Sequence, residues 1–486
     1  MKWRSVFVGV LLVAFLSAAG AAETKVEYLA VFVGGKKLGY VKHVREAAAG
    51  KVTTSQDMVL TIKRMNIAME MRQSESSVET ADGKPLSFKT VQDFGIVAQT
   101  IEGTVKTDGT VEVVVSSGQK TNTTTMAWPE GAVLPEGLRL LSASKGLKEG
   151  TSYTAKAFTG SMLKALDVEV TIGPAKDVDL LGRVVRLTEA KTVMTGPSGR
   201  IESTSYVDEN FDALKTIVPM MGMQLEMVVC SKAVAMSESD TLDFFDKLLV
   251  ASPAPLENVR SASSISYSIE PTGENARLEF LATPSQKVVR KEKGGFTITV
   301  APVSPAKGGA LPYKGDDPAA TEALKPTRYL QCDTKEIAGL AKIAVGKAAD
   351  AAEAAGRIES YVAKYISEKT LSVGYATALE VAKSKQGDCS EHAVLAAAMC
   401  RAVGVPAQVV TGLAYVSKLG ARSNVFVPHA WFRVHISGKW IDYDAALRGY
   451  GAGHIALAAG HGEPEDFFSV VNTLGYFKIV EVSVKR

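Results

Sequence analysis

The sequence predicts an α+β protein in which a large antiparallel β-rich region precedes a C-terminal unit of helices followed by strands. Between Val26 and about Lys247, apolar and polar residues alternate in runs rich in β-branched types, separated by turn dipeptides such as Asp82-Gly83. From Asp333 onward, apolar residues recur at helical spacing before a further hairpin pattern begins. A chain of 486 residues is long enough for roughly two to four domains.

Residues 1–22 have the pattern of a secretory signal peptide. Lys2 and Arg4 provide a charged start, residues 6–16 form an apolar core shorter than a membrane span, and residues 19–21 (Ala-Gly-Ala) fit a cleavage site. No later segment approaches the roughly 18 consecutive apolar residues of a membrane span. We therefore expect an exported protein, periplasmic or secreted, with no transmembrane helix once the signal peptide is removed. An uncleaved anchor is the alternative.

Residues 23–250 are expected to form large antiparallel sheets with polar outer faces. A hairpin is predicted over Tyr28–Val33 and Leu38–Val44, joined at Gly34-Gly35. Further runs share the β-branched pattern and are predicted as strands: Thr53–Ile62, Ile67–Ser77, Ala98–Val105 and Thr110–Val115. A stretch rich in Pro and Gly near residues 128–137 could divide this region into two units.

Residues 251–318 are predicted to form a small β module followed by a linker. A short amphipathic helix over Ser239–Leu248 precedes the Pro-rich start of this segment. Phe296–Val300 has strand composition, and residues 303–317 are rich in Pro, Gly and Lys, which is typical of a connection. The C-terminal domain is therefore expected over residues 319–486.

Three helices are predicted at the start of the C-terminal domain. Asp333 with Glu336, and Thr377 with Glu380, have the spacing of capping boxes for the first and third helices. The second helix carries an apolar stripe at helical spacing: Ile358, Tyr361, Val362, Tyr365 and Ile366. We expect these aromatic residues in the core rather than at a cofactor.

Cys389 is predicted at the first position of a fourth helix. Asp388 is a good N-cap, Glu391 completes a capping box, and residues 393–403 are mostly apolar until Gly404 ends the helix. Unpaired backbone N–H groups and the helix dipole favour a thiolate at such a position. This placement suits a nucleophile, and a small buried cysteine at a helix start is the structural alternative.

A hairpin downstream supplies a base and a carboxylate. His429 is expected near the start of a strand, and after a turn at Gly438 a second strand brings Asp442 and Asp444. A cysteine, a histidine and a carboxylate in this order could act as nucleophile, base and orienting group. We assign the last role to Asp444, with Asp442 as the alternative on the same strand face. His435 is expected to be structural.

Taken together, these segments resemble the transglutaminase-like superfamily and are most similar to its bacterial cysteine proteins. The segments are Gly-Asp-Cys-Ser-Glu-His at 387–392, His-Ala-Trp at 429–431, and a Trp with an Asp four residues later at 440–444. The resemblance extends over roughly residues 329–459. One departure is that Ala445 and Ala446 follow the Asp, where the family often has Pro or Thr.

The resemblance implies a papain-like catalytic domain in which Cys389 is the nucleophile, His429 the general base and acid, and Asp444 the orienting residue. We expect an exported thiol acyl-transfer enzyme that attacks a peptide or glutamine carboxamide carbonyl through a thioester, with cysteine peptidase or amidase activity favoured over cross-linking. The oxyanion would be held by the Cys389 backbone N–H and one further donor, for which Tyr375 is a weak candidate. Family members often keep a histidine near His454, which we expect in a short helix (454–459) with a structural role.

The expected partner is a protein or peptide substrate. The formal charge of +3 comes with no dominant basic stretch, which argues against nucleic acid. No cofactor is expected, and the oligomeric state is not predicted. Of the remaining cysteines, Cys400 is expected in the core, and a disulfide between Cys230 and Cys332 is a minor alternative.

Two other functions stay open at this point. In the first, Cys389, His392 and His429 ligate zinc, although Cys-x-x-His lacks the paired ligand sets of a typical site. In the second, the chain is a non-catalytic peptide-binding or envelope-assembly protein that retains the fold, with the β-rich region as its interaction surface. A buried, unreactive Cys389 would favour this second function.

Overall fold

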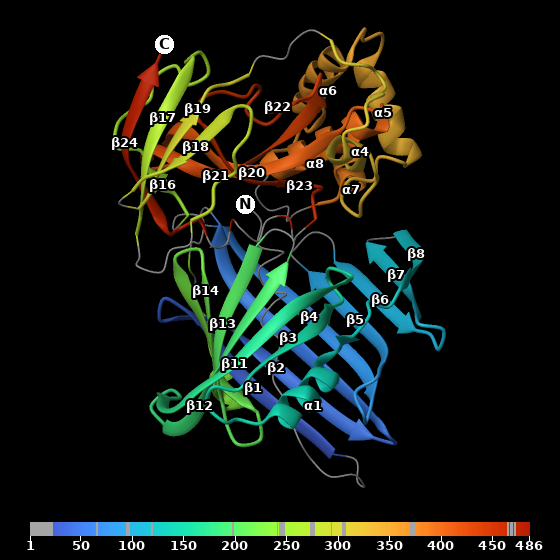
Figure 1. Ribbon diagram of the computed structural model, residues 1–486, viewed down its shortest axis with the longest axis vertical. Helices are drawn as coiled ribbons and strands as arrows, with labels where there is room; N and C mark the ends of the chain where they lie inside the picture. Colours follow the sequence, from blue (N-terminus) through green and yellow to red (C-terminus); the bar gives the residue numbers. More distant parts are fainter. Residues whose placement is uncertain are drawn as a thin grey trace. The chain divides into compact units, whose positions relative to one another are not determined.

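The computed structural model describes residues 23–486 except 65–66, 94–97, 118–119, 197–198, 241, 243–247, 273–277, 293, 304–307, 370–375, 464–465, 467–469 and 471–472. The predicted signal peptide, most of the predicted helix at 239–248, and Tyr375 therefore lie outside the described residues. The described chain forms two compact units that divide near residue 244, drawn from blue to green and from yellow to red (Figure 1).

Within the described residues, the N-terminal unit is one sheet of fifteen strands. The first eight are β1 (Glu23–Val33), β2 (Lys36–Ala48), β3 (Lys51–Arg64), β4 (Ile67–Thr80), β5 (Pro85–Asp93), β6 (Gln99–Val105), β7 (Thr110–Ser117) and β8 (Lys120–Ala127). The others are β9 (Ala132–Val133), β10 (Ser152–Thr159), β11 (Lys164–Asp179), β12 (Val184–Gly196), β13 (Gly199–Val207), β14 (Ala213–Met220) and β15 (Met223–Cys230). The antiparallel β-rich region predicted from the sequence is thereby confirmed.

The sheet consists of two meanders, β1–β8 and β10–β15, which join where β1 pairs antiparallel with β15. Strand β9 pairs parallel with β10. The Pro- and Gly-rich interruption predicted near residues 128–137 contains β9 and the start of α1 (Pro135–Lys145), so it lies between the two meanders. A short helix, α2 (Lys232–Ala235), follows β15.

A buried ionic network holds the N-terminal end of α1. The Glu79 carboxylate accepts the backbone N–H groups of Glu136 and Gly137 at 2.7 and 2.8 Å. The Glu136 carboxylate in turn accepts hydrogen bonds from Arg45 and Arg139. Burial raises the pKa of Glu79 to about 7, and the nearby Glu136 charge adds to this effect, although the two backbone donors oppose it. The network ties α1 to strands β2 and β4.

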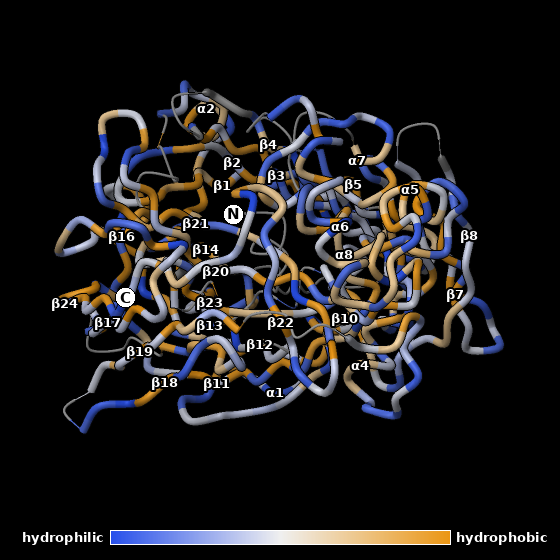
Figure 2. Tube along the Cα trace, turned by 90° about the horizontal axis from the view of Figure 1, so that it is seen from above, coloured by the Kyte–Doolittle hydropathy of each residue, from blue (hydrophilic) through white to orange (hydrophobic). Residues whose placement is uncertain are grey.

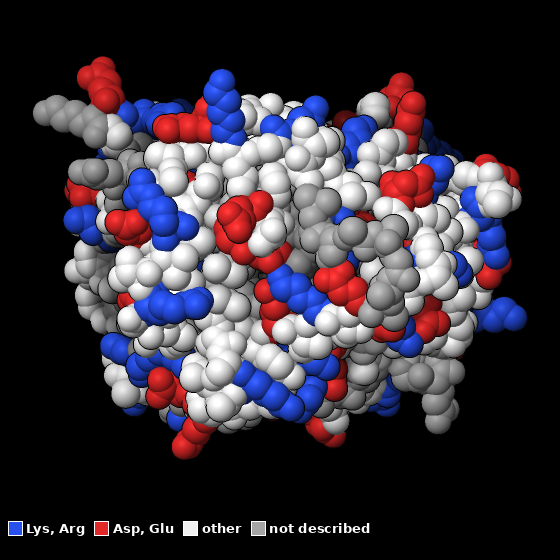
Figure 3. Space-filling view, turned by 90° about the horizontal axis from the view of Figure 1, so that it is seen from below, with Lys and Arg blue, Asp and Glu red and all other residues white. Residues whose placement is uncertain are grey.

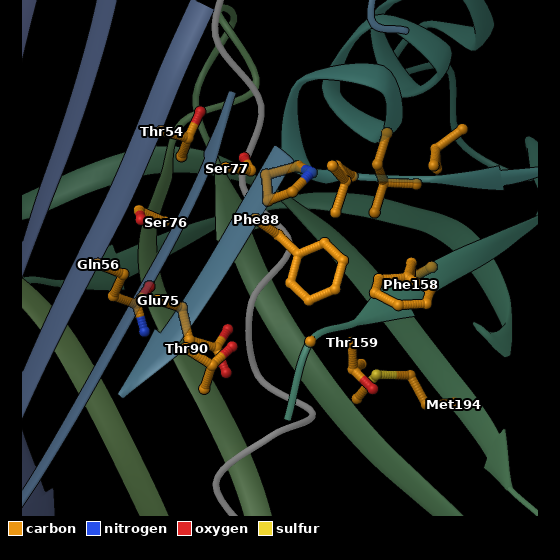
Figure 4. Close-up of a pocket in the computed structure, with 16 residues that line it drawn as sticks. Thr54, Gln56, Glu75, Ser76, Ser77, Phe88, Thr90, Phe158, Thr159 and Met194 are labelled. Carbon is orange, nitrogen blue, oxygen red and sulfur yellow. The ribbon is translucent and has the colours of Figure 1, made fainter. Parts of the chain in front are cut away.

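A small cavity lies beside this network. Figure 4 shows Thr54, Gln56, Glu75 and Thr90 from β3, β4 and β5 together with Phe158, in a cavity of about 60 Å³. Burial raises the pKa of Glu75 to about 7, although Gln73 donates a hydrogen bond to it. A space of this size has room for a few water-sized groups and is far smaller than a drug-sized ligand site, which occupies about 300 Å³ or more.

The helices of the C-terminal unit lie between two groups of strands in the sequence. They are α4 (Pro318–Glu322), α5 (Lys335–Val345), α6 (Ala351–Tyr365), α7 (Ala378–Ser384) and α8 (Cys389–Ala402). The capping box of Thr377 and Glu380 on α7 is confirmed. The predicted cap of α5 is wrong by one residue: the side chain of Thr334, not Asp333, accepts the Ile337 N–H. A Thr hydroxyl can fill the Ncap role as well as a carboxylate, which is why the sequence pattern left the position ambiguous.

Two antiparallel sheets complete this unit. The first contains β16 (Val250–Ala251), β21 (Arg422–Ile436), β20 (Ala407–Leu419) and β23 (His454–Gly460) in this order, with β22 (Lys439–Tyr443) also paired to β21. The second contains β18 (Gln286–Arg290), β19 (Phe296–Val300), β17 (Ser264–Pro271) and β24 (Phe477–Lys485). The predicted β module therefore shares its sheet with a strand from the far end of the chain.

The core of this unit lies between the helices and the first sheet. Helix α8 packs against β20 and β21, and α5, α6 and α7 pack against α8. Apolar residues gather in the region of α5, α6 and α8 (Figure 2). Eleven consecutive residues of α8, from Ser390 to Cys400, are buried, which confirms the core position expected for Cys400.

The short helix predicted over residues 454–459 is wrong, because this segment is strand β23. It pairs antiparallel with β20 from Val409↔Gly460 to Ala414↔His454. The segment is a run of small and apolar residues that has no strong local preference, so pairing to an existing buried strand decides its conformation.

None of the described helices is long and apolar enough to cross a membrane. On the face drawn in Figure 3, Lys and Arg side chains are interspersed with Asp and Glu, and no wide region carries one sign of charge.

Candidate active site

Cys389 is the first residue of α8, where both halves of the predicted capping box form. The Asp388 carboxylate accepts the Ser390 N–H at 3.0 Å, and the Glu391 carboxylate accepts the Asp388 N–H at 2.9 Å. Gly387 precedes this turn with φ +150°, and a Cβ there would lie 2.3 Å from the Cβ of Glu391. Only glycine leaves room for Glu391 to close the box, so the local sequence fixes the half-buried Cys389 at the helix start.

The hairpin of β21 and β22 holds the other two predicted residues. Its register, with Phe432 opposite Tyr443, confirms the hairpin expected from the sequence. His429 lies within β21, opposite Gly412 of β20, and Asp444 directly follows β22. Because α8 packs against β21, the helix start and this hairpin are brought together.

The structure places Cys389, His429 and Asp444 in one chain of contacts, called the Cys-His-Asp cluster below. His429 Nε2 lies 2.7 Å from Asp444 Oδ2, and the Cys389 side chain hydrogen-bonds with the His429 ring. Since Nε2 contacts Asp444, Nδ1 is the ring nitrogen left for the thiol. His429 is 5% exposed and Asp444 is fully buried.

The charges of the cluster stabilise one another. Burial and the Asp388 charge both act to raise the pKa of Cys389, but the charge and hydrogen bond of His429 outweigh them, so the thiol pKa lies below its ordinary value. Burial alone would lower the pKa of His429, yet Asp444 and Cys389 raise it to about 10. Burial disfavours the Asp444 carboxylate, but its imidazole partners hold its pKa far below the usual range. The arrangement favours a thiolate–imidazolium pair beside an ionised carboxylate.

Asp442, the sequence-based alternative, has a different partner. Its Oδ1 accepts the indole N–H of Trp431 at 3.0 Å. Asp444 lies one residue beyond the end of β22, so strand alternation no longer fixes its direction, and its Oδ1 accepts the N–H groups of Ala446 and Leu447. The contact with His429 therefore belongs to Asp444.

Two residues beside the cluster make contacts with Asp444 that the sequence did not predict. His454, at the start of β23, places Nε2 2.9 Å from Asp444 Oδ2, although we expected it to be structural. Glu359 on α6 accepts the backbone N–H of Asp444 at 2.8 Å. Glu359 belongs to no recognisable motif. For His454 the signals were the family resemblance, in which a histidine often lies near this position, and an imidazole at the start of an otherwise apolar segment.

The zinc set considered from the sequence does not assemble among the described residues. His392 Nδ1 lies 2.6 Å from the Asp388 carbonyl oxygen, whereas the His, Cys, Asp and Glu side chains that come within 4.8 Å of one another are those of His429, Asp444 and His454. Hydrogen bonds between the two imidazoles and the carboxylate account for that second grouping. His435 lies apart from the cluster, against Trp440.

All four cysteines are free thiols, so the minor alternative of a Cys230–Cys332 disulfide is wrong. Cys332 is buried and Cys230 is half-buried. Burial raises the pKa of both, in contrast to the lowered pKa of Cys389. Cys389 is thus the cysteine whose surroundings favour a reactive thiolate.

A cleft of about 480 Å³ has His454 in its wall, whereas Cys389, His429 and Asp444 are not among the residues that line it. Tyr415, Leu256 and Val259 contribute apolar surface, and Arg260 and Lys418 contribute cationic groups. Its volume falls within the range of small-molecule and peptide side-chain sites.

Comparison with known proteins identifies one matching family. Residues 338–445 match the sequence profile of the transglutaminase-like superfamily. The matched range includes all three residues of the Cys-His-Asp cluster. No curated protein matches the chain.

Several solved structures are similar to parts of the chain. A candidate cysteine protease from Cytophaga hutchinsonii is 19% identical, covers 47% of this chain and 84% of its own, and has a TM-score of 0.30. The periplasmic domain of TgpA from Pseudomonas aeruginosa, bound to ethylmercury, is 13% identical over 40% and 88% of the two chains, with a TM-score of 0.28. A β-barrel-like protein of a domain family of unknown function from Brucella abortus is 13% identical over 46% and 98%, with a TM-score of 0.32.

Proposed function

The C-terminal part of this chain, residues 338–445, belongs to the transglutaminase-like superfamily, and from this premise we propose that the protein is a thiol acyl-transfer enzyme with Cys389, His429 and Asp444 as its catalytic triad. The observation that supports this most is the unbroken chain of contacts from the Cys389 thiol through His429 to a buried, ionised Asp444. A structural cysteine has no need of such a partner pair.

In the proposed reaction, the Cys389 thiolate attacks the carbonyl carbon of a peptide or glutamine carboxamide, and the carbonyl electron pair moves onto oxygen. The backbone N–H of Cys389, one of the N–H groups that a helix start leaves without an intrahelical acceptor, supports this oxyanion. As the tetrahedral intermediate collapses, the C–N bond breaks and the His429 imidazolium gives its proton to the departing amine. A thioester on Cys389 remains.

Neutral His429 then removes a proton from water or an amine, which attacks the thioester and releases the thiol. Asp444 stays ionised throughout and holds the imidazole with one nitrogen toward the sulfur. With water as acceptor the enzyme is a cysteine peptidase or amidase, and this is the outcome we propose. Export by the signal sequence at residues 1–22 is part of the same proposal and would place the substrate outside the cytoplasm.

The pH dependence of Cys389 alkylation by iodoacetamide tests the proposal without knowledge of the substrate. We expect a midpoint well below the free-cysteine value of about 8.5, returning toward that value in His429→Ala. The other three cysteines are controlled for by Cys389→Ala, which should remove the fast phase. A slow phase with an ordinary midpoint, unchanged by His429→Ala, would overturn the proposal and favour a non-catalytic binding protein.

Activity is the second test. Peptide and glutamine-containing substrates are incubated with wild type, Cys389→Ala and Cys389→Ser, and the release of amine or ammonia is measured. We expect turnover by wild type alone, with unchanged circular dichroism in both variants, because the half-buried side chain only loses its sulfur in Cys389→Ala and exchanges it for oxygen in Cys389→Ser. Equal turnover in Cys389→Ala would refute the assignment of the nucleophile.

A further inference from the structure

The Asp444 carboxylate is shared between two histidines. Its Oδ1 accepts backbone N–H groups from Ala446 and Leu447 at 2.8 and 2.9 Å. Its Oδ2 lies 2.7 Å from His429 Nε2 and 2.9 Å from His454 Nε2. An ionised carboxylate only accepts hydrogen bonds and has about four lone-pair positions, so both imidazoles donate from Nε2 and every position is filled.

The surroundings of His454 hold its ring in this orientation. Nδ1 lies 3.0 Å from the Gly451 carbonyl oxygen and 3.3 Å from the Gly451 nitrogen, so a protonated Nδ1 can donate and a neutral one can accept. The Tyr450 ring lies 4.6 Å from the His454 ring, and the edge of the Trp431 ring packs at 5.2 Å. His454 is 4% exposed. The ring is therefore fixed for either protonation state.

We propose that His454 is a positioning residue that divides the charge of Asp444 between two imidazoles and so sets how strongly His429 holds its proton. This inference rests on the proposed acyl-transfer function. The triad base must hold a proton to keep the thiolate, yet must give it to the departing amine. A second donor on Oδ2 weakens the attraction between Asp444 and the His429 imidazolium, which favours that release.

Two substitutions separate the hydrogen bond from the packing. In His454→Phe, the ring against Tyr450 and Trp431 is kept and the Nε2 donor is lost. In His454→Gln, the side-chain amide can reach the former position of Nε2 and restores a neutral donor. The matched control is His435→Gln. His435 lies in β21 and is buried like His454, but it packs against Trp440, away from the cluster.

The expected results have opposite signs for thiolate stability and turnover. In His454→Phe, Asp444 attracts the His429 imidazolium more strongly, so the Cys389 alkylation midpoint falls by about half a pH unit or more. The turnover number falls about tenfold and KM changes by less than twofold. The reason is that the activation free energy for proton release from His429 rises by about the free energy of one hydrogen bond. His454→Gln restores most of both quantities, and His435→Gln changes neither.

Other ionisable groups near His454 could also affect the pH dependence of Cys389 alkylation. Besides Asp444 and His429, the groups that face His454 are Asp442 and Tyr450, and the adjoining cleft carries Arg260 and Lys418. None of these is altered by the three substitutions. A shift in the alkylation midpoint between His454→Phe and His454→Gln therefore reports the Nε2 donor itself.

Three outcomes would overturn the inference. A midpoint that rises toward the free-cysteine value in both His454 variants would mean simple loss of structure, and unchanged kinetics in both would mean no role. About one zinc per chain in purified wild type, lost in His454→Gln, would mean that His429, Asp444 and His454 are metal ligands. If His429→Ala also leaves alkylation unchanged, the proposed function itself fails; if only the His454 variants are silent, the inference alone fails.

Discussion

The Glu359 carboxylate on α6 accepts the backbone N–H of Asp444 at 2.8 Å, across 85 positions of sequence. The bond fixes the residue that follows β22 and so supports the carboxylate that contacts His429. Burial raises the pKa of Glu359 to about 7, and the Asp444 charge adds to this effect, although the backbone hydrogen bond opposes it. A group of this kind links the stability of the C-terminal unit to pH.

For Glu359, the unfolded chain releases the proton near pH 4.5 and the folded chain near pH 7. The unfolded state therefore binds fewer protons in this window, so the contribution of Glu359 to the free energy of unfolding is largest below pH 4.5 and is lost as the pH rises to 7. Glu359→Gln keeps an acceptor for the Asp444 N–H but does not ionise. We expect the variant to gain on the order of 2 kcal/mol over wild type at pH 8, after a discount for partial exposure, and little at pH 5. Urea unfolding monitored by tryptophan fluorescence measures both; an equal difference at the two pH values would contradict the linkage.

Asp444→Asn and Asp442→Asn should have very different effects. An Asn at 444 has no negative charge to stabilise the His429 imidazolium, and its amide has only one oxygen to accept hydrogen bonds from the two imidazoles. We therefore expect turnover to fall by roughly 10³- to 10⁴-fold and the Cys389 alkylation midpoint to rise. An Asn at 442 retains an oxygen for the Trp431 indole, so activity should stay within a few fold. Steady-state kinetics on both variants decide between them, and the reverse pattern would transfer the orienting role to Asp442.

Gly412 on β20 is a close-approach position. A Cβ there would lie 2.0 Å from the Ile455 carbonyl oxygen and 2.9 Å from the Trp431 ring. Gly412→Ala must displace β23 and with it His454, so we expect a loss of roughly 2 kcal/mol in stability and a Cys389 alkylation midpoint that shifts in the same direction as in His454→Phe. Gly339 in α5 is the control, because a Cβ there meets nothing within 4 Å. Gly339→Ala should raise stability by about 0.5–1 kcal/mol. Thermal unfolding compares the two; a harmless Gly412→Ala would show that β20 and β23 are not held this closely.

In the N-terminal unit, Glu136 bridges two buried arginines, Arg45 and Arg139. Glu136→Gln leaves two guanidinium groups without a buried counter-charge, and we expect a loss of roughly 3 kcal/mol in the stability of this unit. Its exposed counterpart is Glu70, which pairs with Arg72 at the surface. Glu70→Gln should change stability by less than about 0.5 kcal/mol. Chemical unfolding gives the comparison, and Cys389 alkylation should be unaffected in both if the loss is local to this unit.

Much of this protein follows from interactions between residues close in sequence. The capping box at Asp388 and Glu391, the hairpin that holds His429, and six of the eight strands of the first meander were predicted, whereas β5 and β8 were not. Capping, turn formation and strand alternation depend on side chains within a few positions of one another. Even the contact between His429 and Asp444 spans only 15 positions within one hairpin.

Tertiary structure alone decided the rest. Residues 454–460 became a strand because β20 offered a buried edge, and this brought His454 to Asp444. The choice between Asp442 and Asp444 depended on where β22 ends. The hydrogen bond that supports Asp444 comes from Glu359, which lies on a helix 85 positions earlier in the sequence. Such contacts carry no local pattern, because a buried carboxylate takes whichever donors the packed elements bring within about 3 Å of it. The sequence by itself therefore determined which chemical groups are present and the local secondary structure that carries them. The packing of the elements determined which of these groups come into contact.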